Sequence, residues 1–165
     1  HICCGELVRV RGQPDVWEGS ADMADTVYLK RGVEQYVRGT LCEEYGVKFS
    51  SKILTLVTGG THEFDAVSED GTVVAAIKAA GGKTSGGRFP SGSVKSATAE
   101  VYYLSLVSAP LRLLVLTSPE FYGIMSRRLE GRLAPGISLK LIELPPDIQS
   151  EVDRIRSIAS REVGG

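Results

Sequence analysis

The chain has 165 residues, of which 42% are hydrophobic and 24% are charged, and these shares exclude a disordered segment and a disulfide-rich scaffold. This length suffices for one domain with a single buried core. The formal net charge of -1 excludes a protein that coats nucleic acid through its overall charge, although it leaves room for a local basic groove.

The cysteines and the apolar runs bear on the cellular location. Cys3, Cys4 and Cys42 lack a metal-ligand spacing, and the adjacent pair is a poor candidate for a disulfide. No apolar run approaches the roughly 20 residues that span a bilayer, and no signal-peptide pattern opens the chain. We therefore expect a cytoplasmic protein without a membrane partner.

Composition divides the chain into three parts. Residues 1–21 contain one short alternating run, which predicts an N-terminal arm or an edge strand. Residues 22–144 carry the core domain. Residues 145–165 begin with two prolines and continue as an amphipathic C-terminal helix.

The core domain begins with a predicted helix from about Asp22 to Tyr45. Apolar side chains recur there at helical spacing, and Gly46 provides a stop. Asp22 and Asp25 are the candidate N-caps.

Three consecutive strands follow this helix. Residues 52–58 form the first, and Gly59-Gly60 can turn the chain back. Residues 61–68 and 72–79 are alternating runs on either side of Asp70-Gly71, a dipeptide typical of two-residue hairpin turns. The sequence therefore predicts a three-stranded meander.

The second half of the core contains one more helix and two more strands. A loop rich in glycine and serine at 81–92 leads into a helix over 93–108. Strands are predicted over 111–117 and 137–144. The order α-β-β-β-α-β, with an extra strand, predicts an α/β (α+β) fold with a central mixed sheet of four to five strands flanked by helices.

The hairpin brings an acid and a lysine together. With Asp70-Gly71 at the tip, Asp65 lies opposite Ala76, and alternation puts Lys78 on the same face. A divalent metal held by carboxylates can activate water against a phosphodiester, and a lysine can orient that water and stabilise negative charge. The structural alternative is an exposed ion pair between Asp65 and Lys78.

The runs Glu63-Phe64-Asp65-Ala66-Val67 and Val73-Val74-Ala75-Ala76-Ile77-Lys78 resemble the core motif of the PD-(D/E)xK nuclease superfamily, and the element order over about 22–144 resembles its restriction-endonuclease-like fold. The resemblance implies a nuclease that hydrolyses DNA, with RNA also open, and that uses Mg²⁺ or Mn²⁺. It implies a homodimer by analogy with double-strand cutters. Asp65 takes the place of the first acid and Lys78 that of the lysine.

Mg²⁺ needs only a few protein ligands, so Asp65, the Ile77 backbone carbonyl and a second acid would suffice. The family's second acid maps to position 76, which is alanine and cannot bind a metal. The acid has moved elsewhere, a single Glu-to-Ala change has inactivated the site, or the domain is a catalytically dead relative.

Glu100 is the candidate for a moved acid. It borders the apolar stripe of the helix over 93–108, where a buried carboxylate needs a metal or a lysine as partner. Some members of the superfamily are similar in carrying the acid on this helix. The alternative is a Glu100 side chain that tips outward into solvent.

Two further acids near the motif are weaker candidates. Many family members have an acid from the first helix near the metal, which suggests Glu34, although a solvated glutamate is the ordinary case. Glu63 shares the expected face of Asp65 and would lie opposite Lys78. His62 faces the other way and is predicted to be structural.

The glycine-rich loop carries the expected contacts to nucleic acid. Lys83, Arg88 and Lys95 lie among residues whose backbone amides can approach phosphates. Gly81-Gly82-Lys83-Thr84 resembles the end of a nucleotide-binding loop, but Ile77 stands where that motif has its first glycine, so no nucleoside triphosphate is expected. The two functional hypotheses are a nuclease and a catalytically inactive domain that binds nucleic acid or a protein.

Overall fold

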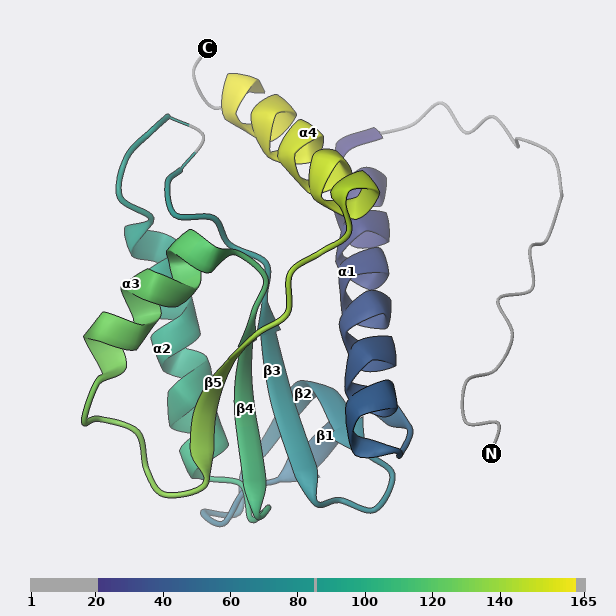
Figure 1. The fold of residues 1–165 in the computed structure, drawn as a ribbon, viewed down its shortest axis with the longest axis vertical. Helices are drawn as coiled ribbons and strands as arrows, with labels where there is room; N and C mark the ends of the chain where they lie inside the picture. The colour runs from purple at the N-terminus through teal and green to yellow at the C-terminus, as the bar shows by residue number, and fades with distance from the viewer. Residues whose placement is uncertain (1–20, 85, 163–165) are drawn as a thin grey trace, which may run out of the picture.

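The computed structural model describes residues 21–84 and 86–162, and its ribbon is shown in Figure 1. It is an α+β fold in which four helices flank a five-stranded mixed sheet, so the predicted fold class and strand number are confirmed. Residues 1–20 of the expected N-terminal arm lie outside the described residues. The elements in chain order are α1 (Ala21–Tyr45), β1 (Phe49–Thr55), β2 (Thr61–Ser68), β3 (Val73–Lys78), α2 (Ser91–Ser105), β4 (Leu111–Leu116), α3 (Pro119–Leu129), β5 (Ile137–Leu141) and α4 (Pro146–Glu162).

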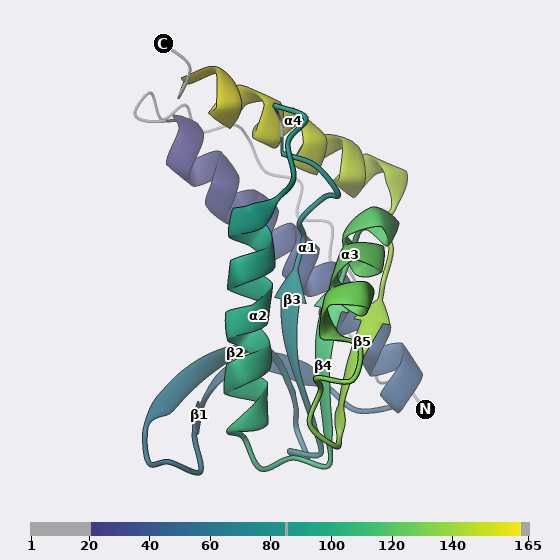
Figure 2. The same ribbon diagram turned by 90° about the vertical axis from the view of Figure 1, so that its left-hand side faces the viewer.

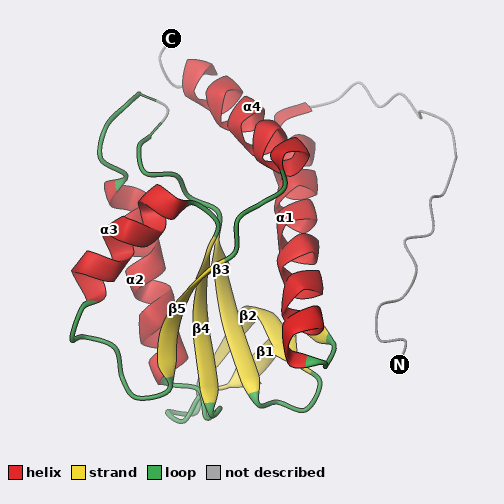
Figure 3. Cartoon of the chain, in the orientation of Figure 1, coloured by secondary structure: helices red, strands yellow, loops and turns green. Residues whose placement is uncertain are grey.

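The strands lie in the order β1-β2-β3-β4-β5. The first three strands form an antiparallel meander, whereas β3, β4 and β5 run parallel. Parallel neighbours need a crossover connection, and α2 and α3 supply the two crossovers. The carboxyl ends of β3, β4 and β5 therefore meet at one edge of the molecule, which Figure 3 shows beneath α4.

Helices cover both faces of the sheet (Figures 1 and 2). On one face, α2 and α3 pack through Leu104 and Phe121 against an apolar cluster that includes Leu114. On the other face, α1 and α4 pack through residues such as Val37 and Val152. Strands β3 and β4 are buried on both faces, which explains their continuous apolar runs.

The ends of β1, α2 and β5 lie up to about three residues from the predicted bounds, and two further features differ from the sequence prediction. Helix α1 already includes Asp22 and Asp25, so the capping assignment was wrong. Helix α3 was not predicted, although its start carries a local signal: the Ser118 side chain accepts a hydrogen bond from the Phe121 N–H, and Pro119 occupies the first turn. The crossover between β4 and β5 required this helix.

The hairpin between β2 and β3 has the predicted register. Ala66 pairs with Ala75 and Val67 with Val74. At the turn, Gly71 has a φ of 73°, a conformation that glycine adopts without steric cost. The Asp70 carboxylate accepts hydrogen bonds from the N–H and the hydroxyl of Thr72. Local turn chemistry thus fixes the pairing.

A β-bulge interrupts β2 beside this ladder. Ser50 pairs with Val67 but Lys52 pairs with Phe64, so Ser51 alone faces both Asp65 and Ala66. The alternation of side chains between the two faces of the sheet breaks at this bulge. Phe64 packs in the cluster under α2, whereas Ala66, two residues later, packs in the cluster under α1. The bulge decides where Asp65 points.

Candidate active site

Asp65 lies where β2 and β3 part. The backbone pairing of these strands reaches only to Ala66 and Ala75, and beyond it Asp65 Oδ2 accepts a hydrogen bond of 2.8 Å from the Ile77 N–H. The carboxylate therefore lies between the strands and not squarely on the face of Ala76 and Lys78, which corrects the expectation from simple alternation. Because the N–H and C=O of one strand residue point to the same side, the Ile77 carbonyl is directed toward this opening as well.

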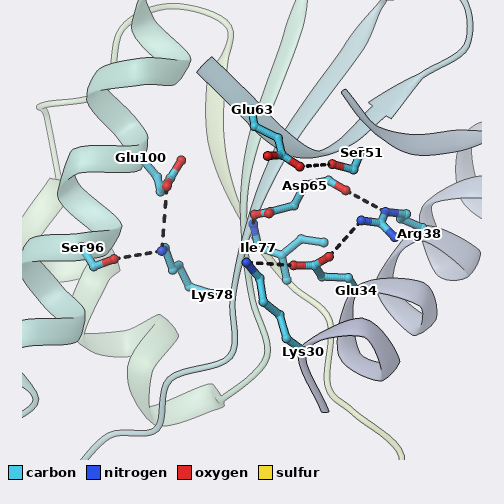
Figure 4. Close-up of polar contacts among 10 residues, drawn as sticks. All are labelled: Lys30, Glu34, Arg38, Ser51, Glu63, Asp65, Ile77, Lys78, Ser96 and Glu100. Atoms are coloured by element: carbon cyan, nitrogen blue, oxygen red, sulfur yellow. Dashed lines mark hydrogen bonds and ion pairs between the residues drawn. The ribbon is translucent and has the colours of Figure 1, made fainter. Parts of the chain in front are cut away.

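Glu34 approaches Asp65 from α1 (Figure 4). Burial raises the pKa of Glu34, and the nearby Asp65 carboxylate raises it further. Lys30 and Arg38 work against this shift, and Arg38 Nη2 donates to Glu34 at 2.9 Å. The Arg38 Nε donates to the Asp65 carbonyl at 2.7 Å, which ties α1 to the bulge. The weaker sequence candidate Glu34 is thus the acid that lies with Asp65.

Lys78 turns toward α2, away from Glu34. Its ammonium donates to the Ser96 hydroxyl at 2.8 Å and lies 3.9 Å from Glu100 Oε1. Figure 4 shows these three side chains on the opposite side of Asp65 from α1. Ala76 lies on the same side of β3, where it is fully buried in the apolar cluster under α2.

His62 holds the other oxygen of Glu100. The distance from its Nε2 to Glu100 Oε2 is 3.1 Å, and its ring stacks on Tyr103 with a centroid distance of 3.8 Å and an interplanar angle of 6°. The structural role predicted for His62 fits these contacts, but its link to Glu100 was missed. Strict alternation would place His62 on the face opposite Lys78, but the bulge at Asp65 and Ala66 reverses the alternation, so His62 lies on the α2 side.

Glu63 does not lie opposite Lys78. The ladder between β2 and β3 has ended before this position, and Glu63 pairs instead with Ile53 of β1. Its carboxylate accepts a hydrogen bond of 2.8 Å from the Ser51 hydroxyl at the surface. The expectation that it would lie opposite Lys78 was wrong, because the strands diverge.

The basic loop projects from the same end of the sheet as Lys78 (Figure 1). Lys83 and Arg88 lie on this loop, whereas Lys95, which was expected there, lies in the first turns of α2. All three are exposed, and within residues 21–84 and 86–162 none of them forms an ion pair. A turn stabilises the loop, since the Thr84 N–H donates to the Arg88 carbonyl and the Arg88 N–H to the Thr84 hydroxyl. The three cations are free to meet phosphates.

The donor set around Asp65 suits Mg²⁺ only in part. Among the described residues, no group of three or more histidine, cysteine, aspartate or glutamate side chains converges as a metal site. Asp65, Glu34 and the Ile77 carbonyl nonetheless offer two carboxylates and one carbonyl, and Mg²⁺ is commonly held by one or two carboxylates together with water and substrate oxygens. Glu100 contacts His62 and Lys78, so it does not take the place expected of a moved metal ligand beside Asp65.

No protein-family model, no curated protein and no solved structure matches this chain. None of the described helices has the length and apolar character to cross a membrane. Function has to be argued from the site itself.

Proposed function

We propose that this chain is a metal-dependent nuclease that hydrolyses phosphodiester bonds of DNA. One observation carries the proposal: charged side chains flank both sides of the opening between β2 and β3, from α1 and β2 on one side and from β3 and α2 on the other. Glu34 lies near Asp65, Asp65 is bound to the Ile77 N–H, and the next residue, Lys78, reaches Glu100. The resemblance to the PD-(D/E)xK motif supports the same activity for this arrangement.

Each group has a proposed task. Asp65, Glu34 and the Ile77 carbonyl would hold Mg²⁺ or Mn²⁺, which supplies Lewis acidity and a water of lowered pKa when it is bound. Lys78 stabilises the negative charge that develops on the phosphate. Glu100 and Ser96 fix the ammonium.

Exposed cations would hold the substrate. Three exposed cations come after β3, the strand that ends at Lys78: Lys83, Arg88 and Lys95. They have no protein counter-ions among the described residues. Such cations contact the phosphate backbone without reading sequence. We propose DNA as the partner, and the cleavage assays described below also include RNA.

A second candidate is a catalytically inactive domain of the same fold that binds nucleic acid or a protein. Ala76 favours it, because the position of the family's second acid is an apolar, fully buried side chain. Such a domain would retain the basic loop but would not catalyse hydrolysis.

Cleavage assays separate the two candidates. Single-stranded DNA, double-stranded DNA and RNA are incubated with the chain in Mg²⁺, in Mn²⁺ and in a chelator. We expect metal-dependent cleavage that K78M lowers by roughly 100-fold, since a charge-stabilising donor is commonly worth that much. K52M, which removes an exposed lysine on β1, is the matched control. DNA binding without cleavage in either metal would favour the inactive domain.

A further inference from the structure

A polar cavity opens at the carboxyl ends of β3, β4 and β5. Its volume is about 420 Å³. Its walls come from residues 79–81 after β3, residues 117–120 after β4, residues 143–144 after β5, and α4. Ligands of parallel α/β sheets bind at this end of the strands. Ala79 directly follows Lys78, so the cavity adjoins the candidate active site.

Two polar side chains in this cavity lack a partner. The Thr117 side chain belongs to a residue that is only 3% exposed, and its hydroxyl forms no hydrogen bond within the described part of the chain. Arg156 of α4 is half-buried and has neither a hydrogen bond nor an ion pair there. A Cβ on Gly81 would lie 3.3 Å from Arg156 Nη1, so the guanidinium rests against the loop backbone.

Burial lowers the pKa of Arg156, and Asp153 only partly offsets this effect. Among the described residues the fully buried side-chain atom without a partner is Arg112 Nε, which lies outside this cavity, so the Thr117 hydroxyl and the Arg156 guanidinium are open to the cavity. Two donors from different elements are therefore available there to a ligand that accepts hydrogen bonds.

Carboxylates in the same cavity restrict the ligand's charge. Glu120, Glu143 and Asp153 line it, against the single guanidinium of Arg156. This excess of negative charge disfavours a phosphate or a carboxylate. A metal is disfavoured too, because no three such ligands converge among the described residues. The cavity suits a neutral ligand that both donates and accepts hydrogen bonds.

We propose that this cavity binds a single nucleobase, for which guanine is the best match. A guanidinium donates well to O6 and N7 of guanine, and a carboxylate can accept from its N1–H and amino group. The volume lies within the roughly 300–1,000 Å³ of small-molecule sites. The inference rests on the proposed function, because the base would come from an unpaired nucleotide of the nucleic-acid substrate beside Lys78.

Nucleoside binding tests the site without any cleavage. The full chain is titrated in a chelator with guanosine, adenosine, cytidine and inorganic phosphate, and binding is followed by calorimetry and by amide NMR. We expect guanosine to bind best and to shift the amides of Gly81 and Thr117. R156Q should weaken guanosine binding by roughly 10-fold, the usual range for a bidentate arginine–guanine contact.

The controls keep the result separate from folding and from catalysis. R154Q removes an exposed arginine on the same helix and should leave binding unchanged. T117V removes only the hydroxyl and should also weaken binding, while thermal unfolding reports whether each variant folds. Absence of guanosine binding, equal binding of all nucleosides, or preference for phosphate overturns the inference. Guanosine binding by a chain that cleaves nothing would sustain this site and refute the nuclease.

Discussion

Arg38 links Glu34 on α1 to Asp65 on β2, and the Asp65 carboxylate helps to raise the pKa of Glu34. Two like charges are held together there because Arg38 bonds the Glu34 carboxylate and the Asp65 carbonyl at once. This pair is the part of the candidate site most open to direct measurement.

D65N should lower the pKa of Glu34 toward its ordinary value. Asparagine removes the negative charge and keeps an oxygen that can accept from the Ile77 N–H, so the bulge should persist. Carboxyl-carbon NMR measures the titration. E63Q is the control, since Glu63 bonds Ser51 at the surface and its charge should leave the Glu34 titration unchanged.

E34Q should stabilise the chain more at neutral than at acid pH. A raised pKa means that the folded state binds more protons than the unfolded state between the ordinary value of 4.5 and the folded value. The stabilising contribution of Glu34 is full below that window and is lost as pH rises through the folded pKa. The gain in unfolding free energy from E34Q over the parent should therefore be larger at about pH 7 than at about pH 4. A gain independent of pH would contradict the raised pKa.

A76E should destabilise the fold without creating an active site. The position is fully buried among apolar side chains, so the new carboxylate would lose its hydration, at a cost of about 3 kcal/mol or more. A99E on the exposed surface of α2 is the matched control and should cost little. Chemical denaturation measures both. A stable A76E variant that gains nuclease activity would show instead that an acid belongs at position 76.

The rings of His62 and Tyr103 should be energetically coupled. Their close stacking predicts an interaction of about 0.5–1.5 kcal/mol beyond simple burial. The double-mutant cycle H62A, Y103A and H62A/Y103A measures this term. Because His62 also holds Glu100, H62A should lower any nuclease activity that depends on Lys78. Additive effects on stability would refute the coupling.

G82A should disturb the packing of the basic loop on α3. A Cβ on Gly82 would meet the Glu120 Cβ at 2.4 Å, which forces the loop or the helix to move. We expect a loss of about 1–3 kcal/mol of stability, as for other overpacked sites. G86A in the same loop meets only Thr84 Oγ1, at 3.9 Å, and should be tolerated. Equal melting temperatures for the two variants would contradict this close approach.

The amino-acid sequence alone determined the features that depend on neighbouring residues. The Asp70-Gly71 turn predicted the register of β2 and β3, because a two-residue turn sets which residues face each other. Helical spacing and Gly46 likewise predicted the extent of α1 to its last residue. The start of α3 carries a similar local signal in Ser118-Pro119, although no helix was predicted there.

Only the tertiary structure decided how the candidate site is arranged. The bulge opposite Ser51 turned Asp65 out of simple alternation, and a bulge arises from the pairing of two strands and not from either sequence by itself. The neighbours of Glu34 and Glu100 depend on how α1 and α2 pack on the sheet. The unpartnered Arg156 also became visible only when α4 closed over the ends of the parallel strands. Local backbone preferences fix turns and helices, whereas packing between distant elements fixes which charges meet.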